Sequence, residues 1–451
     1  MESVLYGLKK IIPEPIFRFF QPMYHRLLAG CAAAYYGFPA RGLVVIGVTG
    51  TNGKSTVVEM VHEIFAHAGI SVGSLSSVRF KIKNDDIPNQ FKMTLPGRFV
   101  VQQFLSDAKK AGATHVILEV TSEGVKQFRH WYIPFAAAVL TNLTPEHIEA
   151  HGGFENYKKA KGELFKALGG TGISVVNLAE RQANYFLSFP AARKIGYALD
   201  KKIFSAKTSQ IIAPSNFYIT KEGITLYFKE GWGVEAPLHG RFNAENMLAA
   251  IATALQFDIS HETIRETFEN FRGVPGRMEE MQKEPFRVIV DYAFTPNALR
   301  QVYQTLLGNR EQGMENTRRN LMPDAHSPLS ELICVLGAAG GGRDRWKRPE
   351  LGKIAGEYCR EVIITNEDPY DEDPRSIMHD VEKGVLMRNA HHEIIEDRRL
   401  AIRDALESAR PGDVVIITGK GSETTMAVAG GKKIDWNERE IVREELKRIR
   451  Q

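Results

Sequence analysis

Cysteine is scarce in this chain of 451 residues, which contains only Cys31, Cys334 and Cys359. Three cysteines cannot form the disulfide framework of a small secreted protein, and such a low number is typical of a reducing cytosol. The sequence also lacks any run that approaches the roughly 20 apolar residues of a membrane span. We therefore expect a cytoplasmic protein that does not associate with membranes.

An excess of charge of one sign is absent as well. Lysine and arginine number 58, aspartate and glutamate number 54, and the net charge is +4. Because nucleic-acid binding usually requires a strongly basic surface, no nucleic-acid partner is expected. The hydrophobic content of 43% and the charged content of 25% are ordinary globular values, and they exclude a disordered or fibrous chain.

The length of the chain exceeds what one hydrophobic core usually supports. We predict a short helical N-terminal segment (1–41), a central nucleotide-binding domain (42–277) and a C-terminal domain (278–451). The first segment is aromatic, basic and interrupted by prolines, which indicates short helices. Its expected role is to pack against the next domain, and the alternative is an amphipathic helix on a membrane surface.

Short apolar runs alternate with helix-like segments through both large domains. This alternation is typical of βαβ units with mostly parallel sheets. The predicted fold class is therefore α/β, with a P-loop central domain followed by a Rossmann-like C-terminal domain. The predicted strands are 43–48, 114–120 and 136–140 in the first, and 288–290, 332–336, 361–365 and 413–418 in the second.

Three further segments have a distinct composition. Residues 217–220 and 224–228 flank Lys221-Glu222-Gly223, which predicts a β-hairpin. Residues 309–330 are polar and contain Gly, Asn and Pro, so we expect an exposed loop. The last fifteen residues are mostly charged and predict a solvated terminal helix.

A glycine-rich segment follows the first predicted strand and opens a predicted helix. It reads Gly47-Val48-Thr49-Gly50-Thr51-Asn52-Gly53-Lys54-Ser55-Thr56. Such a loop turns backbone N–H groups towards phosphate oxygens at a helix N-terminus. Lys54 would reach the β/γ-phosphates and the Ser55 hydroxyl would ligate Mg²⁺, although the glycine spacing differs from the usual form of this motif. We therefore predict that residues Gly50 to Thr56 bind a nucleotide.

The phosphate loop and eight later segments, in this order along the chain, resemble the motifs of the Mur ligase and folylpolyglutamate synthase superfamily. Within it, the resemblance is strongest to the Mur ligases that add the third residue of the peptidoglycan stem peptide. The later segments are Glu119-Val120-Thr121-Ser122, Thr141 to Gly152, Tyr157 to Lys161, Phe242 to Asn246, Gly273 to Glu279, Asp291 to Pro296, Arg343 to Pro349, and Asp397-Arg398 with Gly419 to Glu423.

This resemblance implies an ATP-dependent ligase that works through an acyl phosphate. Phosphorylation of a carboxylate by ATP creates a leaving group that an amine can displace, so the protein mostly positions groups and neutralises anionic charge. The resemblance assigns Lys54, Glu119, His147 and Lys161 to catalysis and Ser55, Glu119, His147 and Lys161 to Mg²⁺. Lys161 would be carbamylated, because magnesium prefers oxygen ligands to an ammonium.

The alternatives for these residues are a surface carboxylate for Glu119, a structural histidine for His147 and a solvated helix lysine for Lys161. Further ATP contacts implied by the resemblance are Asn246, Arg277, Asp291, Phe294 and Arg343. Lys347 is a further cation near the nucleotide. The implied substrate-binding residues are Thr94, Thr121, Gln127, Arg129, His151, Arg348, Asp368, Tyr370, Gly419 and Glu423.

The segment that selects the amino acid departs from one family pattern. Family members that select meso-diaminopimelate have Asp-Asn-Pro-Arg, and its arginine pairs with the second carboxylate. Here the matching residues are Glu367-Asp368-Pro369-Tyr370. The loss of the arginine and the presence of two acids favour lysine or ornithine, while diaminopimelate stays possible because Arg348 and Glu423 remain.

The expected partners are a nucleotide-linked muramoyl peptide and a free amino acid. Only 41 residues precede the predicted central domain, where the family has a domain that holds the uridine nucleotide, so recognition of UDP is left open. The same chemistry on a folate-like or polyamino-acid acceptor is the second hypothesis. A non-catalytic nucleotide-binding protein is the third, and the retained Lys54, Ser55, Glu119, His147 and Lys161 argue against it.

Overall fold

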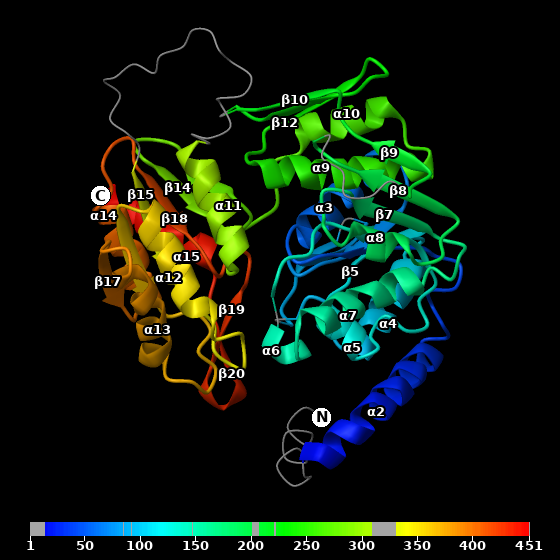
Figure 1. Cartoon of the computed structure of the whole chain (residues 1–451), viewed down its shortest axis with the longest axis horizontal. Helices are drawn as coiled ribbons and strands as arrows, with labels where there is room; N and C mark the ends of the chain where they lie inside the picture. The colour runs from blue at the N-terminus through cyan, green and yellow to red at the C-terminus, as the bar shows by residue number, and fades with distance from the viewer. Residues whose placement is uncertain are drawn as a thin grey trace.

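The computed structural model describes residues 14–83, 85–91, 93–146, 148–200, 207–220, 222–308 and 331–450. It contains two large sheets, each with helices on both faces (Figure 1). This arrangement confirms the predicted α/β class with two sheet domains. The predicted loop at 309–330 lies outside the described residues.

The first sheet has the strand order β4-β3-β2-β5-β1-β6-β7-β8-β9, and its first two neighbouring pairs are antiparallel while the others are parallel. The three predicted strands of this region correspond to β1, β5 and β6. The strands are β1 (Val44–Thr49), β2 (Val72–Leu75), β3 (Arg79–Ile82), β4 (Asp85–Pro88), β5 (His115–Glu119), β6 (Phe135–Leu140), β7 (Ile173–Asn177), β8 (Arg193–Tyr197) and β9 (Gln210–Ile212).

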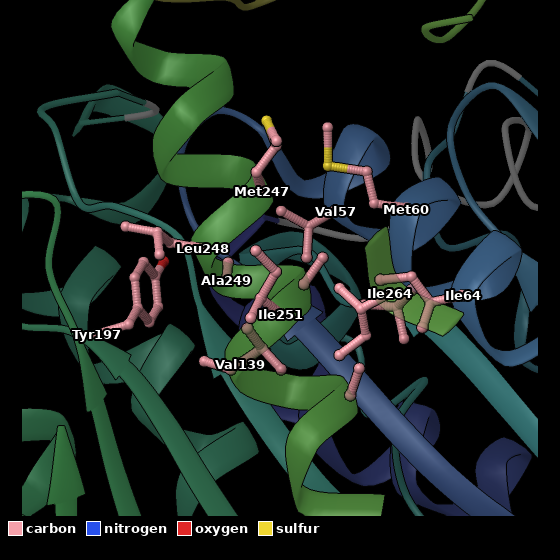
Figure 2. Close-up of a cluster of buried hydrophobic side chains, with 14 of the residues drawn as sticks. Val57, Met60, Ile64, Val139, Tyr197, Met247, Leu248, Ala249, Ile251 and Ile264 are labelled. Carbon is pink, nitrogen blue, oxygen red and sulfur yellow. The ribbon is translucent and has the colours of Figure 1, made fainter. Parts of the chain in front are cut away.

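Helices bury both faces of this sheet. One face carries α3, α9 and α10, and the other carries α4, α5, α7 and α8. Val57, Met60 and Ile64 of α3 pack against Met247 and Ile251 of α9 (Figure 2). The helices are α3 (Lys54–His67), α4 (Arg98–Lys110), α5 (Ser122–Lys126), α6 (Ile148–His151), α7 (Phe154–Lys166), α8 (Ala183–Leu187), α9 (Arg241–Ala254), η1 (Leu255–Phe257) and α10 (His261–Asn270).

A small antiparallel sheet is added to the central domain. It contains β10 (Asn216–Ile219), β11 (Ile224–Tyr227) and β12 (Gly233–Ala236). The pairing of Ile219 with Ile224 confirms the predicted hairpin. The third strand was missed, because Gly233 to Ala236 is too short to show an alternating pattern.

The second sheet has the order β13-β14-β18-β15-β16-β17, and only β13 runs antiparallel to its neighbour. All four predicted strands of this domain are present as β14, β15, β16 and β18. Its strands and the hairpin after it are β13 (Glu279–Gln282), β14 (Arg287–Val290), β15 (Leu332–Leu336), β16 (Glu361–Thr365), β17 (His391–Ile395), β18 (Val414–Ile417), β19 (Thr425–Val428) and β20 (Lys432–Asp435).

Among the described residues of this domain, five α-helices cover the sheet, three on one face and two on the other. The predicted terminal helix is confirmed, but Val442 and Leu446 bury one side of it against the sheet, so it is amphipathic instead of fully solvated. The helices are α11 (Pro296–Leu307), α12 (Lys347–Tyr358), α13 (Pro374–Leu386), α14 (Arg398–Glu407) and α15 (Glu438–Ile449), with η2 (Ala429–Gly431) between β19 and β20.

The described part of the N-terminal segment is one helix, α2 (Glu14–Tyr35), which extends from the central domain at the lower right of Figure 1. The prolines predict several short helices, and this prediction is wrong for residues 14–35. Pro22 removes one backbone hydrogen bond without ending the helix. Beyond it, Ala29, Ala32 and Ala33 are buried where α2 meets α4, and this packing supports the helix.

Two of the three cysteines lie together in the second domain. Cys334 in β15 and Cys359 after α12 are joined as a disulfide, and both are buried. The low cysteine count does not predict this pair, because the cysteines are 25 positions apart in the chain and meet only where α12 returns the chain to the sheet. No helix among the described residues is long and apolar enough to cross a membrane.

Candidate active site

A cavity of about 610 Å³ lies between the carboxyl ends of the strands of the two large sheets. In open α/β sheets, ligands usually bind at this edge. The whole segment from Gly50 to Thr56 lines the cavity, together with Glu119, Lys161 and Asn246 from the central domain and Arg277, Asp291, Phe294 and Arg343.

The phosphate loop begins where β1 ends. The strand is apolar and buried because β5 and β6 pair with it on either side. A side chain is excluded at Gly50, since a Cβ atom there would lie 1.9 Å from Thr141 Oγ1. Gly53, with a φ of 81°, starts α3 without a side-chain cap. The first N–H groups of α3 are therefore left to bind an anion.

Lys54 and Ser55 converge on Glu119 at the end of β5. Ser55 Oγ donates to Glu119 Oε2 at 2.8 Å. Lys54 Nζ lies 3.9 Å from Glu119 Oε1 and donates to the Thr51 carbonyl at 2.8 Å. Burial lowers the pKa of Lys54, and the neighbouring Glu119 opposes that change. A carboxylate and a hydroxyl in contact are the oxygen ligands that Mg²⁺ prefers.

Lys161 lies on α7, on the other side of the loop. Its Nζ atom donates to the Gly50 carbonyl at 2.6 Å and lies 4.6 Å from the centre of the Tyr157 ring. The side chain is only 2% exposed, so it is not a solvated helix lysine. Burial lowers the pKa of Lys161 well below its ordinary value, and the nearby Lys54 cation lowers it further.

His147, the other predicted metal ligand, lies outside the described residues. The neighbouring Glu146 is buried and forms an ion pair with Lys347 at 2.9 Å. Burial raises the pKa of Glu146, and Lys347 opposes this rise. Lys347 also lies 5.0 Å from the centre of the Phe294 ring. This pair therefore links the central domain to α12 of the second domain across the cavity.

Backbone groups already use both oxygens of Asp291. Oδ2 accepts from Met278 N at 2.7 Å and Oδ1 accepts from Ala293 N at 2.6 Å. Arg277 stacks on Tyr292, with 4.0 Å between its guanidinium carbon and the ring centre. Asp291 therefore holds the chain that carries Arg277 and Phe294 into the cavity, in addition to its predicted contact with the nucleotide.

The predicted substrate-binding residues divide into two groups. Most line the cavity, whereas Gln127, His151 and Arg348 do not. Gln127 accepts a hydrogen bond from Arg129 at 2.7 Å, and His151 lies 3.1 Å from the Ser122 hydroxyl. The residues that line it are Thr94, Thr121, Arg129, Asp368, Tyr370, Gly419 and Glu423.

Arg348 is almost fully buried and lies outside the cavity. Its guanidinium pairs with Glu372 at 2.9 Å and with Asp380 at 3.3 Å. These contacts attach α12 to α13. Arg343, in contrast, lines the cavity, where it lies 4.0 Å from Glu123 and beside Tyr370.

Glu367 and Asp368, the two acids of the segment that selects the amino acid, are not free to attract an amine. Both oxygens of Asp368 accept hydrogen bonds from Lys420, at 3.0 and 3.1 Å. Burial raises the pKa of Glu367 to about 7, and Asp368 and Glu423 add to the rise while Arg398 and Lys420 oppose it. Near neutral pH, Glu367 therefore carries only part of a negative charge.

Ser77, in the turn between β2 and β3, was not identified from the sequence. Its N–H donates to Glu119 Oε2 at 2.8 Å and its hydroxyl lies 2.7 Å from Ser55 Oγ. Arg277 Nη2 also donates to this hydroxyl at 3.3 Å. Glu180 is a second cavity residue that no motif indicated, and burial raises its pKa to about 7. Only the packing of distant segments reveals either residue.

We expect Ser77→Ala to weaken the binding of Mg²⁺-ATP roughly fivefold. Two hydrogen bonds of its hydroxyl are lost, at a cost of about 1 kcal/mol, while its N–H still orients Glu119. Titration calorimetry with a non-hydrolysable ATP analogue and Mg²⁺ measures the change. Ser188→Ala is the control, because this exposed hydroxyl donates to the Tyr185 carbonyl and does not line the cavity. Unchanged affinity in Ser77→Ala would mean that the hydroxyl does not support the site.

Comparison with known proteins assigns the family. Residues 48–254 match the Mur ligase middle domain, and residues 276–421 match the glutamate ligase domain of Mur ligases. UDP-N-acetylmuramoyl-L-alanyl-D-glutamate--2,6-diaminopimelate ligase of Halalkalibacterium halodurans is 33% identical over 94% of this chain and 82% of its own length. The ligase of the same name from Gloeobacter violaceus is 35% identical, over 94% and 81%.

Solved structures agree with this assignment. A diaminopimelate ligase structure of the same name is 29% identical with a TM-score of 0.57, and the match covers 91% of this chain and 79% of that one. Folylpolyglutamate synthase of Mycobacterium tuberculosis shares the fold, with a TM-score of 0.65 at 19% identity over 87% and 91% of the two chains. The chain therefore belongs to the Mur ligase family of ATP-dependent acid–amino-acid ligases.

Proposed function

We propose that this ligase adds meso-diaminopimelate to a UDP-linked N-acetylmuramoyl-L-alanyl-D-glutamate. The reaction joins the amino group of the amino acid to a carboxylate of the acceptor and converts ATP to ADP and phosphate. The observation that carries the proposal is the convergence of Lys54, Ser55 and Glu119 at the phosphate loop, inside a cavity that both domains line. The named activity of the relatives supplies the acceptor and the amino acid.

Ser55 and Glu119 would hold the Mg²⁺ that accompanies ATP. Their oxygens are in contact and match the ligand preference of this ion. The bound ion neutralises phosphate charge, and Lys54 adds a cation aimed at the transferred phosphoryl group. His147 remains a predicted ligand of a second Mg²⁺.

We further propose that Lys161 is carbamylated. Its Nζ atom is buried beside another lysine, where an ammonium is costly. A neutral amine can form a nitrogen–carbon bond to CO₂ and release one proton, which leaves a carbamate anion. This change would replace a repelling cation beside Lys54 with two oxygens that suit Mg²⁺.

Diaminopimelate replaces lysine and ornithine as the expected amino acid. Neither of the two acids that favoured a basic side chain offers a full free negative charge, because Asp368 pairs with Lys420 and burial raises the pKa of Glu367 to about 7. Arg343, beside Tyr370, can pair with the second carboxylate in place of the absent arginine. The residues proposed to act on ATP and Mg²⁺ keep the same roles with either amino acid.

We expect kcat/KM for diaminopimelate to exceed that for lysine by at least about tenfold, because one charge-assisted pair contributes roughly 1.5–3 kcal/mol. Phosphate release by the purified enzyme, with the UDP-linked muramoyl dipeptide as acceptor, measures both values. Arg343→Ala should lower the ratio of kcat/KM for diaminopimelate to kcat/KM for lysine. Arg345→Ala, which changes an exposed arginine two residues away, should leave this ratio unchanged.

Two results would contradict parts of this proposal. Preference for lysine in the wild type would reject the amino acid and the role of Arg343. Phosphate release with a folate or polyglutamate acceptor, and none with the muramoyl dipeptide, would reject the acceptor and leave the ligase chemistry intact.

A further inference from the structure

The outer side of α2 is an apolar stripe that faces solvent. With 100° per residue, six exposed positions between residues 23 and 35 fall within about 120° of the helix circumference. The side chain exposures reach 65% for Met23, 67% for Leu27 and 76% for Tyr35. The six positions are Met23, Tyr24, Leu27, Cys31, Ala34 and Tyr35.

The opposite side of α2 attaches the helix to the central domain through small residues. Ala29, Ala32 and Ala33 are buried where α2 meets α4. The larger apolar side chains thus face outwards, which reverses the usual pattern of a helix packed on a core. Exposed apolar patches of this kind mark interaction sites.

Aromatic and basic residues border the stripe. Tyr35 contacts Phe99 of α4, and Tyr132 lies against Gly30 of α2. Arg26, on the flank of the helix, stacks on Phe128 and Trp131, at 4.9 and 5.4 Å from their ring centres. Residues 1–41 contain five lysines and arginines against two acidic residues. Tyrosine and tryptophan with flanking cations are typical of segments that lie at a lipid–water interface.

We propose that α2 docks this enzyme on an anionic lipid surface. The helix that carries the stripe extends from the body of the protein (Figure 1). A bilayer interface can take up the exposed side of such a helix without a matching groove. The apolar side chains enter the interface. Arg26 and the excess of basic residues in 1–41 attract the anionic headgroups.

The docked helix adjoins one end of the active-site cavity. His25 of α2 is within hydrogen-bond distance of Arg98, and Arg98 donates to the Gln127 carbonyl at 2.9 Å. Gln127 in turn accepts from Arg129, which lines the cavity beside Leu95. Membrane docking would therefore hold this end of the cavity close to the lipid surface, whichever amino acid the enzyme adds.

Vesicle flotation with the full chain tests the proposal. Vesicles of phosphatidylglycerol and phosphatidylethanolamine should bind the wild type, pure phosphatidylcholine vesicles should bind it less, and added salt should weaken the binding. Met23→Glu with Leu27→Glu should reduce the affinity for anionic vesicles at least about tenfold. In the wild type both apolar side chains leave water when the helix binds, whereas glutamate side chains do not. The matched control is Leu386→Glu with Met387→Glu, which changes a leucine and a methionine that are 54% and 69% exposed in the second domain.

Phosphate release and circular dichroism verify that both double variants remain folded and active. Two outcomes would overturn the proposal: wild-type protein that stays unbound with anionic vesicles, or equal binding by the stripe variant. If sedimentation velocity shows a wild-type dimer that only the stripe variant disrupts, and vesicles bind neither, the stripe is instead an interface between two copies of this chain.

Discussion

Lys54→Ala is expected to lower kcat for phosphate release on the order of a hundredfold to a thousandfold or more. Loss of one preorganised donor to a transition state commonly has an effect of about this size, and Lys54 also supplies a full positive charge. The fold should survive the change, because Ser55 and the Ser77 N–H continue to hold Glu119. A steady-state assay of phosphate release, with thermal unfolding measured in parallel, separates the two effects.

The matched control for Lys54 is Lys353→Ala, which removes a partly exposed lysine that pairs only loosely with Glu350, at 3.9 Å. Its activity should equal that of the wild type. A Lys54→Ala enzyme that keeps a tenth of the wild-type rate would show that this lysine does not act on the transferred phosphoryl group. In that case the phosphate-loop assignment, and with it the proposed mechanism, would have to be abandoned.

Lys161→Ala should be nearly inactive, and acetate or propionate should restore part of its activity. The truncation removes the side chain that would carry the carbamate and opens space next to the Gly50 carbonyl. A small carboxylate can enter that space and supply the missing oxygens. Phosphate release measured against increasing carboxylate concentration should rise and then saturate.

Two comparisons make the rescue specific to Lys161. Lys166→Ala, an exposed lysine on the same helix, should be fully active and insensitive to acetate. The wild type should lose activity when CO₂ and bicarbonate are removed and recover when they return. An unmodified amine at Lys161, observed by mass spectrometry of the active enzyme or in a crystal with ATP and Mg²⁺, would refute carbamylation.

The position of Ser77 shows why the two lysine variants differ from the serine variant in expected effect. Lys54 and Lys161 each determine a full unit of charge at the phosphate site, Lys54 as a cation and Lys161 as the proposed carbamate anion. Ser77 instead joins Glu119, Ser55 and Arg277 through neutral or singly charged hydrogen bonds. We therefore expect a change in nucleotide affinity from Ser77 and a change in turnover from the lysines.

Local sequence signals were sufficient for the strands that were predicted, among them β1, β5 and β18, and for the phosphate loop. The apolar runs at 44–49, 115–119 and 414–417 are buried parallel strands, and such strands consist of nearly continuous apolar residues. Gly50 to Ser55 is recognisable because the loop contacts phosphate mainly through backbone that is contiguous in the chain.

Elements with weak local patterns were missed or misjudged. β17 (His391–Ile395) is an edge strand with two histidines at its start, so it lacks the apolar run of a central strand. α2 continues through Pro22 because the helix packs against α4 and its alanines at 29, 32 and 33 are buried. The general tendency of proline to end a helix does not take this tertiary packing into account.

Contacts between distant segments were decided by the tertiary structure alone. Asp368 and Lys420 are 52 residues apart, and their ion pair removes the negative charge on which the preference for lysine rested. Arg348 belongs to a recognisable motif, yet its guanidinium points to Glu372 and Asp380 because α12 packs on α13. A motif specifies which side chains are present, whereas packing decides which partner each charge meets and whether water reaches it.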